Sequence, residues 1–201
     1  MSISIVLSLL PAAFAALLAP SIIEPAIEPR TFSIDSAHSN VGFKAKHLGI
    51  LNVNGRFADY DATIKVDPAN LSTLEATATV RIASVDTGVE RRDNHLKSAD
   101  FFDADTHPTM TFVSTGVSNV NGNTFDLNGN LTIRGTTKPI VLKGELAGTV
   151  SFMGKERIAL KATGTVNRFD YGLQWNSLTE AGGLVVSQDI EIILEIQAVA
   201  N

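Results

Sequence analysis

The chain has 201 residues, of which 44% are hydrophobic and 18% charged, and its formal net charge at pH 7 is −5. This length accommodates one all-β domain of ordinary size and a short leader. The acidic balance argues against a nucleic-acid partner, because no cluster of Lys and Arg is there to displace counterions from phosphates. Cysteine is absent, which excludes disulfides, thiol nucleophiles and thiolate metal sites.

The N-terminal segment has the features of an export signal. Residues 1–23 carry no ionisable side chain, and Ala13–Ala15 fits the small-x-small pattern of a signal-peptidase site. We therefore predict a signal peptide over 1–15, a proline-rich linker over 16–30 and a single domain over 31–201, acting in the periplasm or outside the cell. Retention of the leader as a membrane anchor is the alternative.

A period of two residues dominates the rest of the chain. From Phe125 to Arg134 apolar and polar residues alternate without a break, which places one set of side chains on each face of an extended strand. The same pattern returns in several other stretches, at 41–45, 62–66, 74–82, 140–150, 158–166 and 190–196. Many antiparallel strands with one apolar face form either a sandwich or a closed barrel.

Taken in chain order, the expected strands are interrupted once by a helix. The first strands are predicted over 41–47, over 53–66 with a bulge near 58–59, and from the turn at 67–70 to Val85. A helical insertion follows over about 87–102, with Asp86 or Thr87 as N-cap and Glu90 in the first turn. Strands resume at Thr109, with hairpin turns at 121–122 and 135–137.

About eight strands joined by short turns favour an up-and-down barrel over a Greek-key sandwich. Barrels of this size are either just filled by side chains or just hold one small ligand. Phe43, Phe57, Phe112 and Phe125 supply an aromatic wall, but other inward positions are small. The small positions are Ala62, Ala76, Ala78, Gly129, Gly144, Gly148, Ala162 and Gly164. They indicate a cavity, although glycines that relieve strain in a coiled sheet would give the same pattern.

Several polar residues are candidates for chemistry, each with a plainer alternative. His47 shares the phase of Phe43 and is predicted to point inward, or else to be a hydrogen-bonded structural histidine. Arg91, Arg92 and His95 suit a ligand headgroup, or else form ion pairs on a solvated helix. Arg168 and Asp170 are predicted to pair with each other or with the helix, at a structural corner.

No catalytic or metal-binding pattern emerges. The Asp, His and Ser of 35–39 lie too close together on one strand to converge on a reacting atom as a triad does. None of the four histidines forms a zinc-binding pair of known spacing.

Several long blocks, in order, resemble the YceI-like family of exported, lipocalin-like proteins. The blocks are 34–43 (IDSAHSNVGF), 46–49 (KHLG), 92–103 (RDNHLKSADFFD), 108–112 (PTMTF), 131–140 (LTIRGTTKPI) and 167–172 (NRFDYG). The resemblance implies an eight-stranded antiparallel barrel around an apolar tunnel that binds polyisoprenoid chains, such as isoprenoid quinones or polyprenyl phosphates. The family has no defined catalytic constellation. The chain departs from the family pattern at Phe169, at Tyr171 and in the turn 187–189.

The resulting expectation is an all-β, eight-stranded lipocalin-like barrel that sequesters or transports an isoprenoid lipid and is not an enzyme. The residues expected to surround the lipid are Phe43, Phe57, Phe112, Phe125, Leu127, Leu131, Leu142, Gly144, Leu160, Ile192 and Leu194. No cofactor other than the bound lipid is expected, and both transient membrane contact and a homodimer are compatible with the sequence. The alternatives are an enzyme or accessory protein acting on a bound isoprenoid, with His47 as its reactive group, and a ligand-free structural or stress-response barrel.

Overall fold

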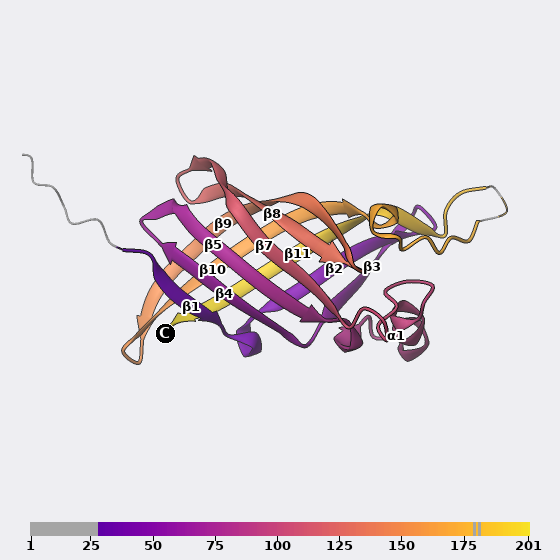
Figure 1. Cartoon of the computed structure of the whole chain (residues 1–201), viewed down its shortest axis with the longest axis horizontal. Helices are drawn as coiled ribbons and strands as arrows, with labels where there is room; N and C mark the ends of the chain where they lie inside the picture. The colour runs from indigo at the N-terminus through magenta and orange to yellow at the C-terminus, as the bar shows by residue number, and fades with distance from the viewer. Residues whose placement is uncertain (1–27, 179, 181) are drawn as a thin grey trace, which may run out of the picture.

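Strands make up most of the computed structural model, which describes residues 28–178, 180 and 182–201 (Figure 1). The predicted signal peptide lies outside the described residues, as does nearly all of the linker. The strands are β1 (Arg30–Ile34), β2 (Asn40–His47), β3 (Leu51–Phe57), β4 (Tyr60–Asp67), β5 (Asn70–Arg81), β6 (Val85–Asp86), β7 (Thr109–Asn121), β8 (Thr124–Ile133), β9 (Thr136–Phe152), β10 (Lys155–Asn167) and β11 (Val186–Ala200). The helices are α1 (Glu90–Lys97) and the short 3₁₀ turns η1 (Ser36–His38), η2 (Ile82–Ser84) and η3 (Arg168–Tyr171).

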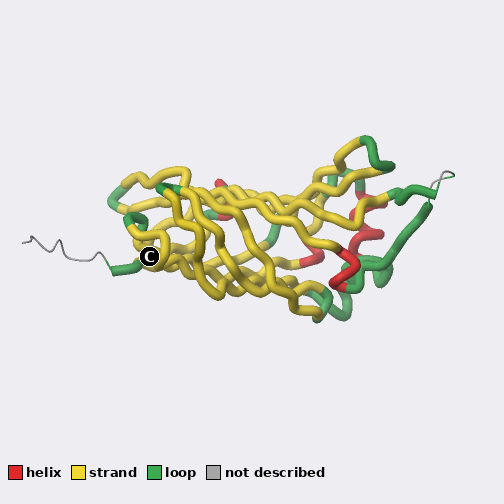
Figure 2. Tube along the Cα trace, turned by 90° about the horizontal axis from the view of Figure 1, so that it is seen from above, coloured by secondary structure: helices red, strands yellow, loops and turns green. Residues whose placement is uncertain are grey.

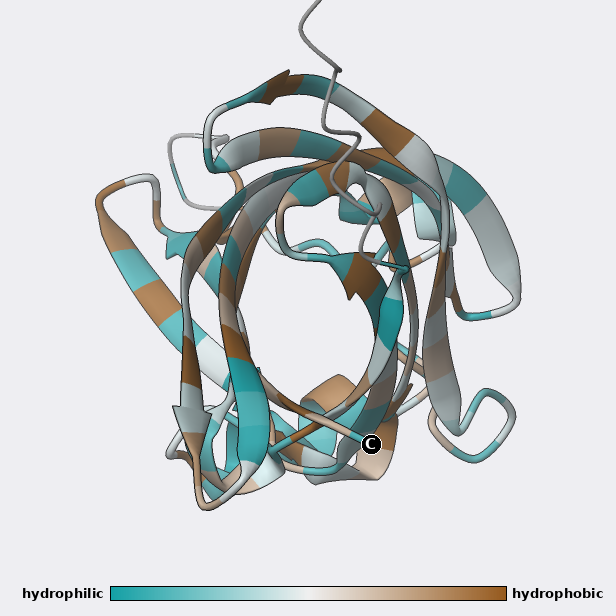
Figure 3. Cartoon of the chain, turned by 90° about the vertical axis from the view of Figure 1, so that its left-hand side faces the viewer, coloured by the Kyte–Doolittle hydropathy of each residue, from teal (hydrophilic) through white to brown (hydrophobic). Residues whose placement is uncertain are grey.

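These strand segments form a closed eight-stranded antiparallel barrel, as Figure 3 shows end-on. The first three barrel strands each consist of two segments in series, β1 with β2, β3 with β4, and β5 with β6. β1 and β2 both pair with β11, which closes the barrel. Every other barrel strand pairs with its neighbour in sequence, so the topology is up-and-down. The predicted fold class is therefore confirmed.

Three details of the predicted elements are corrected. The strand expected over 53–66 is two segments that separate at Ala58 and Asp59. The helix covers only Glu90–Lys97, and its N-cap is Val89, whose side chain makes no capping bond. Asp86 and Thr87 do not cap it, because their side chains bind other partners than the backbone N–H groups of the first helical turn. The Asp86 carboxylate accepts from the Gly88 N–H, and the Thr87 hydroxyl donates to the Asp93 carboxylate.

A bulge changes which side chains of β9 face inward. Leu146 pairs with Leu160, but the next pair along is Gly148 with Ala159, so the register shifts by one residue. A one-residue shift moves side chains to the opposite face of a sheet. Gly148 and Val150 are accordingly exposed, which corrects the expectation that the inward pattern of β9 continues through them.

The two ends of the barrel differ. At the end that carries the C-terminus, tightly packed side chains fill the interior, and Phe32, Val66 and Ile158 are at most 1% exposed. The opposite end carries α1, η3 and the β2–β3 turn (Figure 1). Figure 2 shows helix and loop segments gathered mainly at this second end of an elongated strand body. The barrel is thus closed by packing at one end and covered by helix and loops at the other.

Candidate functional site

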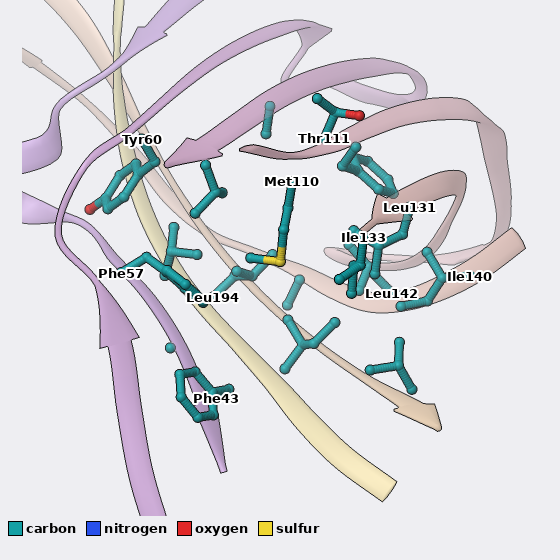
Figure 4. A pocket seen from close by; sticks show the side chains of 18 of the residues that line it. Phe43, Phe57, Tyr60, Met110, Thr111, Leu131, Ile133, Ile140, Leu142 and Leu194 are labelled. Carbon is teal, nitrogen blue, oxygen red and sulfur yellow. The ribbon is translucent and has the colours of Figure 1, made fainter. Parts of the chain in front are cut away.

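An apolar cavity of about 260 Å³ occupies the barrel between its packed end and α1. On the same measure one water molecule needs only about 10–15 Å³, so the space is much larger than a packing defect. Its lining comes from all eight barrel strands, from Leu96 of α1 and from Phe101 and Phe102 beyond it. Figure 4 shows side chains such as Met110, Leu131 and Leu194 converging on this space. The small residues predicted on the inner face therefore accompany a cavity, and strand curvature alone does not account for them.

Ten of the predicted wall residues line the cavity. They are Phe43, Phe57, Phe112, Phe125, Leu127, Leu131, Leu142, Leu160, Ile192 and Leu194. The alanines predicted on the inner face line it as well, at 62, 76, 78 and 162. Alternation locates them correctly because, in an up-and-down barrel, every second residue of each strand faces inward.

Gly144 does not line this cavity, because an aromatic ring covers it. A Cβ added at Gly144 would lie 2.4 Å from Cε2 of Phe125, the residue paired with it on β8. The rings of Phe43 and Phe112 lie equally close to Gly55 and Gly129. These glycines let inward-facing phenylalanine rings lie flat against the barrel wall, which leaves the centre of the barrel open.

His47 lies outside the cavity, which corrects the expectation that its ring points inward. Its side chain is exposed, and its Nδ1 atom is 3.1 Å from the carbonyl oxygen of Val185. His47 does follow the inward phase of Phe43 and Ala45. It is the last residue of β2, however, so its neighbour is the chain segment leading into β11 and not the barrel interior.

The polar cluster on α1 also lies outside the cavity lining. Arg92 donates from Nε to the Thr87 hydroxyl at 2.7 Å and from a terminal nitrogen to the Thr87 carbonyl at 2.8 Å. His95 is 2.9 Å from the Asp100 carboxylate, and its ring packs edge-on against Phe101 and Trp175. Arg91 is exposed to solvent. The contacts of Arg92 and His95 stabilise the α1 region itself. Only Leu96 of the helix reaches the cavity.

Arg168 is the charged side chain that the cavity holds, and its position could not be predicted from the sequence. It is 4% exposed and lines the cavity. Its guanidinium donates to the carbonyl oxygens of Ser187, Leu173, Trp175 and Val186. Among the described residues no carboxylate forms an ion pair with it, so the expected pairing with Asp170 is corrected.

The surroundings of Arg168 are poorly solvating. Burial lowers the pKa of the guanidinium, and the Phe169 ring lies 4.4 Å from its central carbon. Burial likewise raises the pKa values of Tyr60 and Tyr171, two residues that border the cavity, so their hydroxyls stay neutral at physiological pH. Asp61 and Lys161 also border the cavity, but both are exposed. The interior is thus an apolar space with one buried cation near its α1 end.

Comparison with known proteins places this barrel in a family. The YceI-like domain matches residues 32–198 of the chain. The chain belongs to the YceI-like family. A UPF0312 protein of Staphylococcus aureus strain MSSA476 is 38% identical over 162 residues, which cover 80% of this chain and 92% of that protein.

Solved structures of YceI proteins and related barrels share the fold. The Campylobacter jejuni YCEI protein is 39% identical with a TM-score of 0.69, over 84% of this chain and 96% of that one. A polyisoprenoid binding domain from Saccharophagus degradans is 17% identical with a TM-score of 0.63, over 85% of this chain and 98% of that one. At that identity the second likeness concerns the fold alone.

Two features are absent from the described part of the chain. None of its helices is long and apolar enough to cross a bilayer. No group of three or more His, Asp or Glu side chains is placed to hold a metal ion there.

Proposed function

We propose that this YceI-like protein binds an isoprenoid-type lipid in its barrel cavity and sequesters or carries it, without catalysing a reaction. The observation that carries the proposal is the apolar cavity of about 260 Å³, lined from all eight barrel strands. The same fold in the Saccharophagus degradans polyisoprenoid binding domain supports it. The leader pattern in residues 1–15 supports a site of action in the periplasm or outside the cell.

Burial of a branched hydrocarbon chain supplies the affinity. Each methylene transferred from water to an apolar site contributes about 0.8 kcal/mol. At about 0.3 kcal/mol per heavy atom, a forty-carbon chain would reach roughly 12 kcal/mol, which corresponds to a Kd on the order of nanomolar. The polar headgroup then contributes mainly to orientation.

Arg168 is the group in the cavity best suited to a polar end. Its bonds to four carbonyl oxygens use four of the five N–H donors of an arginine. The fifth donor has no partner among the described residues, and the positive charge attracts an anionic ligand. A buried cation with no carboxylate partner in the described part of the chain favours an anion, so we propose a prenyl phosphate in preference to a quinone. The hydrocarbon would extend from Arg168 towards the packed end.

Native mass spectrometry of the purified protein, followed by solvent extraction, tests the proposal. A prenyl lipid bound at one copy per chain is the expected result. An empty protein that also fails to take up added prenyl phosphates and prenyl quinones would refute it. Equal affinities for a prenyl phosphate and for the prenyl alcohol of the same length would refute the role of Arg168 alone.

A pair of neighbouring substitutions separates cavity filling from general damage. Ala162 lines the cavity, whereas the next residue of β10, Thr163, is exposed. Ala162→Phe should abolish binding of a forty-carbon prenyl phosphate, and Thr163→Phe should leave it unchanged. The enzyme alternative depended on His47 facing the lipid, and its exposed position gives that alternative no support.

A further inference from the structure

The β2–β3 turn exposes an unusual amount of apolar surface. Leu48, Ile50 and Leu51 are 44%, 82% and 70% exposed, and Gly49 between them has no side chain. The turn stands at the α1 end of the barrel, beside the segment that leads into β11 (Figure 1). A cluster of large apolar side chains at a loop tip is costly in water and marks a surface that another apolar phase covers.

The chain segment that contains this turn carries basic but no acidic side chains. Residues 36–58 contain no Asp or Glu, although the chain as a whole has a net charge of −5. The same stretch carries Lys44, Lys46 and Arg56, together with two histidines. Lys44 and Arg56 are paired with carboxylates from other strands, and Lys46 is exposed. Apolar side chains flanked by cations are typical of segments that lie in the headgroup region of an anionic bilayer.

The turn is directly continuous with the cavity wall. Ala45 on β2 and Val186 on β11 both line the cavity. Val186 pairs with His47, and the Leu48 N–H donates to the Val185 carbonyl at 2.9 Å. Only two residues therefore separate the cavity-lining Ala45 from the exposed Leu48.

A second exposed apolar turn lies at the other end of the barrel and lacks this continuity. Phe152 and Met153, at the β9–β10 turn, are 57% and 85% exposed. The interior at that end is filled by Phe32, Val66 and Ile158, none of which lines the cavity. Exposure alone does not distinguish the two turns, but connection to the cavity does.

We propose that the β2–β3 turn inserts into the surface of an anionic lipid bilayer, and that lipid passes between bilayer and cavity at this end. Leu48, Ile50 and Leu51 enter the headgroup and upper acyl region, while Lys46 contacts anionic headgroups. The part of this inference that concerns lipid transfer rests on the proposed function. A long prenyl chain is almost insoluble in water, so a direct path from bilayer to cavity removes the need for it to cross solvent.

Vesicle flotation with two matched double variants tests the docking. The test variant is Ile50→Asp with Leu51→Asp, and the control is Phe152→Asp with Met153→Asp, which places the same charges on an equally exposed turn. Vesicles contain either phosphatidylcholine alone or a mixture with phosphatidylglycerol. We expect the test variant to bind mixed vesicles at least about tenfold more weakly than the unmodified protein, since two apolar side chains no longer leave water. The control should bind as the unmodified protein does.

Failure of the docking proposal is distinguishable from failure of the proposed function. Geranylgeranyl phosphate added from a water-miscible solvent should bind all three proteins equally, as measured by native mass spectrometry. Extraction of a long prenyl phosphate from mixed vesicles should be slow only in the test variant. Absence of vesicle binding by the unmodified protein, or equal loss in test and control variants, would overturn the docking. Normal vesicle binding without any uptake of prenyl lipid would overturn the lipid-binding function instead.

Discussion

Replacing Gly144 with alanine should destabilise the barrel by forcing the Phe125 ring away from the wall. The added Cβ would lie 2.4 Å from Cε2 and 2.5 Å from Cζ of that ring. Ordinary carbon contacts are about 3.5–4.0 Å, so the ring has to move by roughly 1 Å or more. It can move only towards the cavity, because Phe125 borders the cavity on its other side.

The size of the effect follows from this geometry. Overpacking of a well-packed interior costs about 1–3 kcal/mol, and the empty space beside Phe125 should keep the cost near about 1–2 kcal/mol. For a domain of this size each kcal/mol lowers the melting temperature by about 2–4 °C. The displaced ring would also narrow the cavity, so affinity for a long prenyl chain should fall.

Gly148→Ala is the matched control on the same strand. A Cβ at Gly148 would meet no heavy atom within 4 Å. Alanine there should be neutral, or stabilise by up to about 1 kcal/mol through the unfolded chain. Urea denaturation followed by circular dichroism measures both free energies of unfolding.

A double-mutant cycle with Phe125→Leu tests the cause. If the ring is the obstacle, Gly144→Ala should cost much less when Phe125 is leucine, with a coupling energy of about 0.5–3 kcal/mol. Strictly additive costs, or a Gly144→Ala variant as stable as Gly148→Ala, would refute the reasoning.

Three further predictions follow from the packing and the charges. Phe32→Ala should lower the free energy of unfolding by about 3–5 kcal/mol, whereas Leu131→Ala should cost only about 2 kcal/mol because its side chain already faces empty space; denaturation curves with equal midpoints would contradict this contrast. Arg168→Lys should lower the free energy of unfolding by about 1–3 kcal/mol, since three ammonium donors cannot replace four guanidinium bonds to carbonyls, and unchanged thermal stability would argue against it. The His38 hydrogen bond holds the pKa of Asp35 below its usual value, so Asp35 stabilises the fold at neutral pH and this contribution is lost as pH falls through the lowered pKa. Asp35→Asn should therefore be less stable than the unmodified protein at pH 7 and converge with it in acid; a stability gap that stays constant in urea titrations down to pH 2 would count against this account.

The inner wall could be predicted because it depends on a local rule. Alternation with a period of two holds along each strand, so Leu127 and Leu142 could be placed inside before any pairing was known. The rule fails where a strand leaves the regular barrel. A bulge in β9, for which the sequence contains no local signal, turns Gly148 and Val150 outward. His47 keeps the inward phase but lies past the end of the cavity.

The polar part of the site depends on backbone carbonyl groups that lie 5 to 19 residues from Arg168 along the chain. The carbonyl oxygens that bind Arg168 come from residues 173–187, and only the folded chain brings them together. The one local signal was an arginine set among aromatic residues just before Gly172, which occupies a left-handed position after η3. The start of α1 was misplaced for a related reason, since Asp86 binds Gly88 and Arg56, and Thr87 binds the side chains of Arg92 and Asp93 instead of the backbone of the first helical turn.

The packed end of the barrel has a consequence for the length of the ligand. Because Phe32, Val66 and Ile158 close the interior, the cavity is a tube with one blind end. A chain whose polar end stays at Arg168 has a fixed length of apolar space ahead of it. Affinity should rise with each added isoprene unit until the blind end is reached, and then stop rising, since further units would push the headgroup off Arg168. The barrel would thus select prenyl lipids by chain length, that is, by their number of isoprene units. This form of selectivity requires no specific contact along the chain.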